Sequence, residues 1–255
     1  LKQLRQALPA IPVAALGRIT DPAEAEGILA RGEAELIGLG RALVTGAAWV
    51  NKAAADRAHD IRYCVSCNSC WGLNVSGAPI ACDNNPRVAL ADEVDYRPAK
   101  ASKRRRVVVV GTGVAGLEAA WVAAERGHQV TVLGRSGEVG GKVRLRSLLP
   151  GGEALSSVFD YQFAAAQRAG VKFELGVEAD IDAVLHAGAE TVILATGSTM
   201  IAPRWLPEEA GAEGWVLDLR TAMAGLHKTR ARQPGVAVIF DMDHTEGTYA
   251  SAQRL

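Results

Sequence analysis

The four cysteines of the chain form a single cluster in the sequence. Three of them follow each other at three-residue spacing and the fourth comes after eleven further residues: Cys64, Cys67, Cys70 and Cys82. Because no charged-then-apolar leader opens the sequence, metal or redox chemistry is favoured over a disulfide framework. Three thiolates at this spacing can surround one face of a cubane while the remote cysteine binds the fourth iron, whereas zinc sites usually present two separated pairs. The pattern predicts a 4Fe-4S cluster, with a zinc site as the alternative.

A glycine-rich turn later in the chain has the spacing of a dinucleotide-binding fingerprint. The apolar run that starts at Val107 leads into Gly111, Gly113 and Gly116, and a helical stretch follows. In such a turn the first glycine permits the tight bend, the second admits a pyrophosphate to the backbone, and the third lets the helix pack closely on the strand. Since the helix N-terminus faces the phosphates, this turn predicts binding of an adenine nucleotide.

One residue of that fingerprint is missing. An acidic side chain usually ends the second strand, roughly 20 residues further on, and accepts hydrogen bonds from the ribose. This sequence has Gly134 there, followed by Arg135. Three explanations are open: the ribose is held differently, the affinity is reduced, or Arg135 contacts a phosphate.

Two further glycine motifs belong to the same predicted nucleotide site. The pair Gly140 and Gly141 permits a second close approach of the backbone. Thr196 and Gly197 follow a predicted strand at the carboxyl edge of the sheet, where ligands of open α/β sheets bind.

Apolar periodicity places these motifs on an α/β framework. The expected strands are short apolar runs, at 12–16, 35–39, 107–110, 129–133, 172–175, 191–194 and 236–240. The expected helices cover 23–30, a stretch from 42 onward, 117–126, 158–169 and a stretch that begins at Tyr249. Strands that are apolar almost throughout indicate parallel sheets. Residues 61–100 carry the cysteines and show little periodicity, so an irregular segment is expected there.

Composition limits the class of protein. The chain has 255 residues, 49% of them hydrophobic, with 28 basic and 28 acidic side chains, so we expect a globular α/β protein of one or two domains. The basic run 103–106 fits a solvated linker, and a nucleic-acid partner is not indicated. No apolar stretch reaches the roughly 20 residues that cross a bilayer. A cytoplasmic protein without a membrane partner is therefore expected.

The two ends of the sequence do not look like domain limits. Leu1 is not an initiator methionine, and a new strand–helix unit is expected to start near the last residue. We therefore expect an internal piece of a longer chain.

In their order along the chain, these motifs resemble one family. It comprises the old yellow enzyme relatives that carry an iron–sulfur cluster and a flavoprotein-like half: the trimethylamine, dimethylamine and histamine dehydrogenases, with the 2,4-dienoyl-CoA reductases close to them. The resemblance covers nearly the whole chain and depends on the cysteines, the fingerprint, Gly140-Gly141, Ala195-Thr196-Gly197, and four earlier motifs: Pro12-Val13, Gly17-Arg18-Ile19 with Asp21-Pro22, Gly38-Leu39-Gly40-Arg41 and Asp60-Ile61-Arg62.

The resemblance implies a fold with several parts. Residues 1–60 would be the last two βα units of an FMN-binding TIM barrel and 61–100 the 4Fe-4S segment with its linker. Residues 101–235 would be a Rossmann-like domain for FAD or ADP, and 236–255 the truncated start of a second NAD(P)-like domain. The loops after the last two barrel strands form a phosphate site in this fold. Four residues would hold the FMN phosphate there: Gly17, Arg18, Gly40 and Arg41.

The resemblance also implies a function. FMN would take electrons from a small-molecule substrate, and the cluster would pass them to an external acceptor such as a flavoprotein. The catalytic residues of the family lie upstream of Leu1, so none is named here. After the expected strand 236–240, Asp241, Asp243 and Glu246 precede Gly247, and their carboxylates would repel a pyrophosphate. This favours an amine dehydrogenase over an NADPH-dependent reductase.

Several alternatives stay open. They are a 2,4-dienoyl-CoA reductase-like enzyme that uses NADPH, an iron–sulfur electron-transfer module without catalysis, and a zinc-stabilised nucleotide-binding regulator. The substrate and the oligomeric state are not indicated. The five histidines show no metal-ligand spacing.

Overall fold

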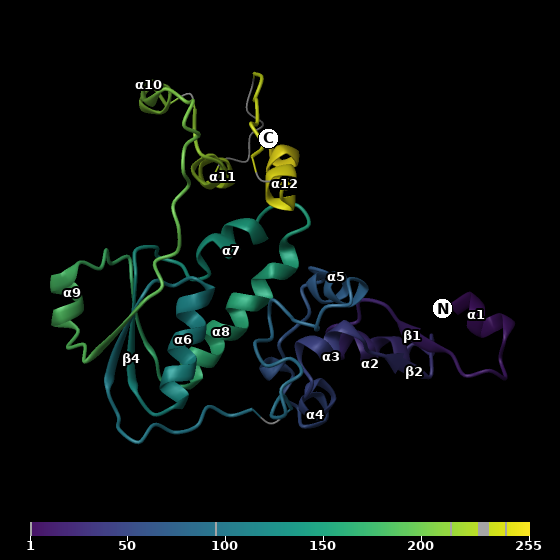
Figure 1. The fold of residues 1–255 in the computed structure, drawn as a ribbon. Coiled ribbons are helices and arrows are strands. Elements are labelled where there is room, and N and C mark those ends of the chain that lie inside the picture. Colours follow the sequence, from purple (N-terminus) through teal and green to yellow (C-terminus); the bar gives the residue numbers. More distant parts are fainter. Residues whose placement is uncertain (1, 95, 215, 229–234, 243) are drawn as a thin grey trace. The chain divides into compact units, whose positions relative to one another are not determined.

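The computed structural model describes residues 2–94, 96–214, 216–228, 235–242 and 244–255. They divide into two compact units, 1–98 and 99–255. In Figure 1 the first unit runs from purple to blue and the second from teal to yellow. Both are α/β units with parallel sheets.

The first unit contains two short parallel strands and a set of short helices. The strands β1 (Ala14–Leu16) and β2 (Leu36–Gly38) pair in register Ala14 to Leu36. The remaining elements are α1 (Lys2–Ala7), α2 (Pro22–Ala30), α3 (Arg41–Thr45), α4 (Trp49–Ala54), the 3-10 turn η1 (Ala58–Asp60) and α5 (Ser69–Val75).

Burial on one face of this small sheet holds the first unit together. The Asp21 carboxylate caps α2 by accepting a hydrogen bond from the Ala23 amide at 2.9 Å. Ala15 of β1 is buried in a core with Ile28 and Trp49. The opposite face is open, because Leu16 is 74% and Leu36 57% exposed. A two-stranded sheet is marginal alone, so packing of its buried face on α2 and α4 stabilises it.

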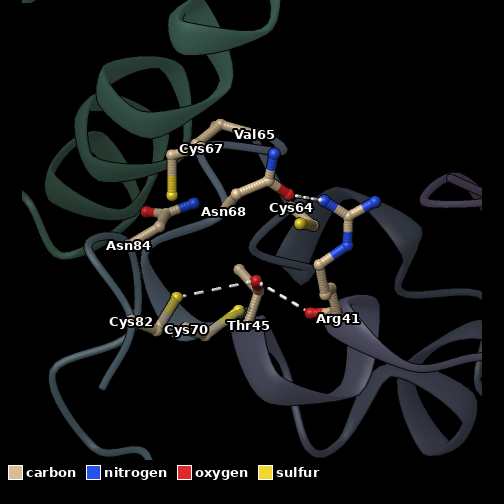
Figure 2. Close-up of a pocket in the computed structure, with 9 residues that line it drawn as sticks. All are labelled: Arg41, Thr45, Cys64, Val65, Cys67, Asn68, Cys70, Cys82 and Asn84. Atoms are coloured by element: carbon tan, nitrogen blue, oxygen red, sulfur yellow. Dashed lines mark hydrogen bonds between the residues drawn. The ribbon is translucent and has the colours of Figure 1, made fainter. Parts of the chain in front are cut away.

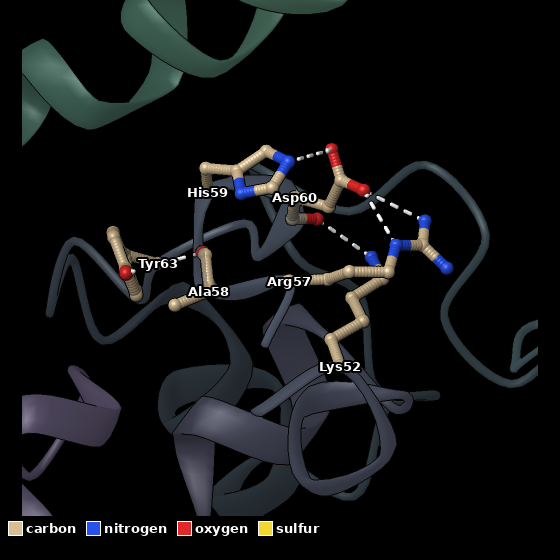
Figure 3. Close-up of polar contacts among 6 residues, drawn as sticks. All are labelled: Lys52, Arg57, Ala58, His59, Asp60 and Tyr63. Atoms are coloured by element: carbon tan, nitrogen blue, oxygen red, sulfur yellow. Dashed lines mark hydrogen bonds and ion pairs between the residues drawn. The ribbon is translucent and has the colours of Figure 1, made fainter. Parts of the chain in front are cut away.

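The chain enters the cysteine segment through a turn that is fixed by side chains (Figure 3). The Lys52 ammonium donates to the Asp60 carbonyl oxygen at 2.7 Å, and the Arg57 guanidinium donates to the Asp60 carboxylate at 2.7 Å. The Tyr63 hydroxyl donates to the Ala58 carbonyl oxygen at 3.3 Å. These contacts fix the backbone on the N-terminal side of the first cysteine.

The second unit is a four-stranded sheet with helices. Its strands are β3 (Arg106–Val110), β4 (Gln129–Gly134), β5 (Lys172–Leu175) and β6 (Thr191–Leu194). Its helices are α6 (Val114–Glu125), α7 (Gly141–Ser147), α8 (Ser156–Arg168), α9 (Ile181–His186), α10 (Glu208–Ala212), α11 (Leu219–Lys228) and α12 (Glu246–Arg254), with the 3-10 turn η2 (Glu153–Leu155).

The order of the strands creates a switch point. The sheet runs β5-β4-β3-β6 and every pair is parallel. The chain moves outward from β3 to β4 and β5 and then returns to the other side of β3 as β6. In open α/β sheets, ligands bind at the carboxyl ends of the strands where the order reverses. The carboxyl ends of β3 and β6 are therefore the expected site.

The central strand and its helix supply the core of this unit. Val108 and Val109 of β3, Leu117 of α6 and Val132 of β4 are almost completely buried. Burying one such side chain contributes roughly 1.5–3 kcal/mol. Figure 1 shows α6 and α8 together on one face of the sheet and α9 on the other. This packing positions the turn between β3 and α6.

The strands expected at 107–110, 129–133, 172–175 and 191–194 are confirmed, but the strand expected at 236–240 is wrong. The described chain is extended there without strand pairing, and Val236 is 94% and Val238 89% exposed. An apolar run becomes a buried parallel strand only where neighbouring strands accept its backbone hydrogen bonds. The Phe240 ring instead packs on Trp205, with ring centroids 4.9 Å apart.

The helix expected from Tyr249 is present and begins earlier, at Glu246. Of the residues in the turn before it, Asp243 lies outside the described residues. Asp241 turns its carboxylate onto the His244 amide, which donates to it at 2.8 Å. In the part of the chain that the structure describes, no helix is both long and apolar enough to span a membrane.

Candidate cofactor sites

The structure gathers the four cysteines around one pocket of the first unit (Figure 2). Figure 2 shows their sulfur atoms turned towards a common space. The pocket is partly open to solvent, and five other residues complete its lining: Arg41, Thr45, Val65, Asn68 and Asn84. The spacing in the sequence therefore becomes a shared site in the fold.

The backbone of the cysteine loop has an unusual conformation. Ser66 and Asn68, on either side of Cys67, have φ angles of 56° and 63°. The left-handed conformation costs a non-glycine residue roughly 1–2 kcal/mol, so it persists only where the surroundings hold it. Left-handed residues alternating with right-handed ones turn successive amides toward one point, a geometry common at iron–sulfur and phosphate sites. The two positive φ angles are of the kind that such loops use.

Polar groups of the loop and of α3 contact the sulfurs. The Ser66 amide donates to the Cys64 Sγ at 3.4 Å, and the Thr45 hydroxyl lies 3.6 Å from the Cys82 Sγ. Desolvation raises the pKa of the Cys67 thiol above its ordinary value, while hydrogen bonds from Ser69 lower it. A ligated cysteine is deprotonated, so metal binding at this site must release protons.

Two buried asparagines hold the segment that follows Cys82. The Asn84 amide donates to the Tyr63 carbonyl oxygen at 2.9 Å, and the Asn85 amide donates to the Val44 carbonyl oxygen at 2.9 Å. Asn84 Oδ1 is buried beside the pocket without a hydrogen-bond partner. Through these bonds, the remote cysteine is fixed to the loop that carries the other three.

The predicted FMN-phosphate residues lie at the carboxyl ends of the two short strands. Gly17 and Arg18 follow β1, both with positive φ, and Gly40 caps α3 after β2. Because β1 and β2 are parallel neighbours, both loops lie at one sheet edge. The Arg41 guanidinium donates to Asn68 Oδ1 in the cysteine loop. The structure therefore brings Arg41 to the cysteine pocket and leaves Arg18 exposed at the edge.

The donor set of the pocket consists of four thiols, and its spacing decides which metal centre it suits. Within the described ranges, no three His, Cys, Asp or Glu side chains gather tightly enough to hold one metal ion. The four thiols are spread around the pocket instead. Each cysteine of a 4Fe-4S cluster binds a different iron, so this group needs four thiols around a common space. The donor set fits such a cluster.

In the second unit, two of the three fingerprint glycines are required by the fold. Gly111 has a φ of 116°, and a Cβ there would lie less than 3.0 Å from the Ala195 carbonyl oxygen. A Cβ on Gly116 would meet the Gly111 carbonyl oxygen equally closely. The start of α6 thus packs directly on the backbones of the β3 and β6 ends.

Gly113 is different, because a Cβ there would meet no protein atom within 4 Å and its φ of −74° suits any residue. The space beside it belongs to the switch point. Gly140 forms a bridge with Gly113, and the Gly140 amide donates to the Thr112 carbonyl oxygen at 2.8 Å. Gly141 lies against Gly113 as well. The two glycine turns therefore form one backbone surface that a phosphate could approach.

The residues at the end of β4 explain the missing acid in steric terms. A Cβ on Gly134 would lie less than 3.0 Å from the Thr112 Cγ2. Arg135 is exposed and lies 4.0 Å from Glu178. The Thr112 side chain therefore occupies space that a larger residue at position 134 would need.

Two cations that the sequence motifs did not predict contact the turn after β6. Gly197 has a φ of 81°, and Ser198 follows Thr196 and Gly197. The Lys142 ammonium donates to the Ser198 hydroxyl at 2.9 Å, and the Arg220 guanidinium donates to the Ser198 carbonyl oxygen at 2.6 Å. Lys142 directly follows the second glycine turn, which was a usable signal. Arg220 lies in α11, and nothing in its sequence context pointed to this site.

Thr45 and Asn68 were also missed in the cysteine pocket. Thr45 follows Arg41 by one helical turn, so the two share a face of α3. Asn68 lies between two cysteines, and asparagine is enriched in the left-handed conformation. Both signals were readable, but neither identifies a sulfur contact without the fold.

The sequence matches the family described as pyridine nucleotide-disulphide oxidoreductase over residues 72–179 and 105–239. These matches cover more than half of the chain, and the chain belongs to this family of oxidoreductases. An NADH oxidase from Thermoanaerobacter brockii is 38% identical over 199 residues, 76% of this chain and 30% of that protein. A probable N-methylproline demethylase from Rhizobium meliloti is 37% identical over 180 residues, 71% of this chain and 26% of that protein.

Solved structures agree with this assignment. A 2-naphthoyl-CoA reductase has a TM-score of 0.79 at 26% identity, covering 90% of this chain and 34% of its own. Histamine dehydrogenase from Rhizobium sp. 4-9 has a TM-score of 0.73 at 29% identity, covering 82% of this chain and 30% of its own. The resemblance expected from the motifs is confirmed. The chain spans between about a quarter and a third of the length of these relatives.

The different surroundings of two glycines lead to a stability prediction. Gly111→Ala should lower the free energy of unfolding by roughly 2–4 kcal/mol, because it combines left-handed strain with a backbone clash. Gly113→Ala should lower it by about 1 kcal/mol or less, since only an N-cap preference is lost. Urea unfolding of both variants measures the difference. Equal losses would show that the open space beside Gly113 is needed for folding.

Proposed function

We propose that this chain is the electron-transfer portion of an FMN- and 4Fe-4S-dependent oxidoreductase, most like an amine dehydrogenase or N-demethylase. The observation that carries the proposal is the pocket lined by all four cysteines, which also includes Arg41 from the edge of the small sheet. When bound, FMN would exchange two electrons with a small-molecule amine, and the cluster would relay them singly to an external acceptor such as a flavoprotein.

The proposal assigns a role to each segment. Residues 1–60 are the last two βα units of an FMN-binding TIM barrel, and the exposed face with Leu16 and Leu36 suits the inner face of such a barrel. Residues 61–100 hold the cluster. Residues 101–235 are a Rossmann-like domain for an adenine nucleotide, FAD or ADP, and 236–255 begin a second NAD(P)-like domain. The catalytic residues lie in the rest of the barrel.

The role proposed for the sheet edge follows from its donors. Gly17, Arg18 and Gly40 lie at the ends of adjacent parallel strands, where a barrel of this kind binds phosphate. Guanidinium groups recognise a phosphate through paired hydrogen bonds. Arg41 has five N–H donors, so it can contact a phosphate while it holds Asn68.

The choice of an amine substrate follows from the relatives and from the tail. The demethylase and the histamine dehydrogenase act on amines by name. The turn with Asp241 and Glu246 offers carboxylates rather than a glycine-lined phosphate site. A second candidate, an NADPH-dependent enzyme like 2,4-dienoyl-CoA reductase, is favoured by the similarity to an NADH oxidase and to a CoA-ester reductase. Saturable NADPH binding lost on replacing the 241–247 turn would favour this second candidate.

The first test concerns the cluster. Anaerobically purified holoprotein should be brown and contain about four irons per chain. Cys67→Ala should remove the colour, because three thiols hold the cubane insecurely, while Ser76→Ala at the end of α5 should keep it. Iron analysis and the visible spectrum measure both. Stoichiometric zinc without iron after anaerobic reconstitution would contradict the proposal.

The second test concerns Arg41. Arg41→Ala should reduce FMN retention at least tenfold, since a charge-assisted phosphate contact contributes roughly 1.5–3 kcal/mol. Arg31→Ala is the matched control, because Arg31 pairs with Glu33 on the exposed side of the same unit. Flavin and iron contents are measured together. If Arg41→Ala keeps its full flavin content but contains less iron than wild type, the role of Arg41 is confined to the cysteine loop.

The third test concerns the adenine nucleotide. Gly113→Val should expel it while FMN and the cluster stay, because the new side chain fills only the open space at the switch point. Gly137→Val is a control, since Gly137 also has nothing within 4 Å of its Cβ position and lies outside the glycine turns. Extraction followed by mass spectrometry identifies the bound nucleotide as FAD or ADP. Nucleotide retained by Gly113→Val would place the site elsewhere.

A further inference from the structure

Helix α3 begins at the predicted FMN-phosphate edge, and both of its end residues contact the cysteine pocket. At its first residue, Arg41 bonds to Asn68 between two of the cysteines. At its last residue, Thr45 faces Cys82, with 3.6 Å between the hydroxyl oxygen and the sulfur. Thr45 is only 3% exposed, so water does not compete freely for this hydroxyl. A buried hydroxyl that contacts a proposed cluster ligand can stabilise negative charge on its sulfur.

The hydrogen bonds that the Thr45 hydroxyl can make depend on whether the Cys82 sulfur carries a proton. The Thr45 hydroxyl has one proton, and it also lies 3.1 Å from the Arg41 carbonyl oxygen, to which it can donate. A free Cys82 thiol can donate its own proton to the Thr45 oxygen. A ligated Cys82 has no proton, so the sulfur can only accept. The Thr45 proton then has two acceptors, the Arg41 carbonyl oxygen and the Cys82 sulfur. It points toward the sulfur when the sulfur is the more negative of the two.

We propose that Thr45 is a positioning residue that donates a hydrogen bond to the Cys82 sulfur and raises the reduction potential of the cluster. The inference rests on the proposed function, because it requires a cluster in the pocket. Reduction of the cluster would add one electron, supplied by the FMN of the proposed function, and would form or break no covalent bond. The Thr45 proton stays on its oxygen and its hydrogen bond to sulfur strengthens. Hydrogen bonds to cluster sulfurs are a known determinant of such potentials.

The direction of the effect follows from charge. The reduced cluster is one charge more negative than the oxidised one, so a donor to its cysteine sulfur stabilises the reduced form more. The Ser66 amide makes the equivalent contact to Cys64, but it is a backbone group that substitution does not remove. The Ser69 side chain also bonds to the Cys67 thiol, but its hydroxyl donates to the Asp83 carboxylate at 2.5 Å as well. Thr45 is a buried side-chain donor beside Cys82 whose hydroxyl a substitution can remove.

The test is a redox titration of the holoprotein followed by electron paramagnetic resonance. Thr45→Val removes the hydroxyl and keeps the shape, and it should shift the one-electron equilibrium toward the oxidised form about three- to tenfold. A tenfold shift corresponds to a potential about 59 mV lower. Thr45→Ser keeps the donor and should retain the original potential, as should Thr191→Val in the other unit.

Two further measurements separate the outcomes. Iron content is determined first, and a wild-type protein without iron overturns the proposed function and this inference together. Iron present with equal potentials in wild type, Thr45→Val and Thr45→Ser overturns the inference alone. If Thr45→Val does not bind a cluster, Thr45→Ala replaces it, and electron–nuclear double resonance of reduced wild type, Thr45→Ser and Thr45→Ala in H₂O and D₂O decides. The Ser66 amide proton also exchanges and is common to all three proteins. An exchangeable proton coupling that wild type and Thr45→Ser share and Thr45→Ala lacks supports the donor. Identical exchangeable couplings in all three overturn it.

Discussion

The second unit depends on the contact of two backbones without a side chain between them. The start of α6 approaches the end of β3 so closely that Gly116 and Gly111 leave no room for a Cβ. This contact sets the direction of α6 and lets its buried Leu117 pack on the strand. It also places the open space beside Gly113 at the switch point of the sheet. Fold and candidate nucleotide site therefore depend on the same steric requirement.

The cysteine segment is organised in a different way. It has little apolar core of its own, and polar contacts define its path: two buried asparagines, the guanidinium of Arg41 and the turn around Asp60. These contacts offset the cost of two left-handed residues in the loop. Hydrogen bonds of the protein itself therefore determine the path of the loop that carries the thiols.

The sequence predicted the features that depend on local pattern. The strands of the second unit and the glycine turns were readable because buried parallel strands are apolar throughout and the fingerprint has fixed spacing. Contacts between distant segments were not readable. The approach of Thr45 to Cys82 and of Arg220 to Ser198 arises only when the chain folds. The strand at 236–240 was wrong for the same reason, since an apolar run does not reveal whether a neighbouring strand exists.

The missing acid of the fingerprint is linked to a second position, because Gly134 lies against the Thr112 side chain. The structure explains why Gly134 takes the place of the usual acid, because the side chain of Thr112 fills the space that a Cβ at position 134 would enter. Thr112 is buried, and its backbone oxygen accepts the Gly140 amide, which fixes its backbone to the second glycine turn. A side chain restored at position 134 would therefore require the Thr112 side chain to change its rotamer or to be replaced by a smaller one. On the proposed function, the nucleotide is then held mainly through its phosphates, by Gly113 and the helix N-terminus, rather than through its ribose.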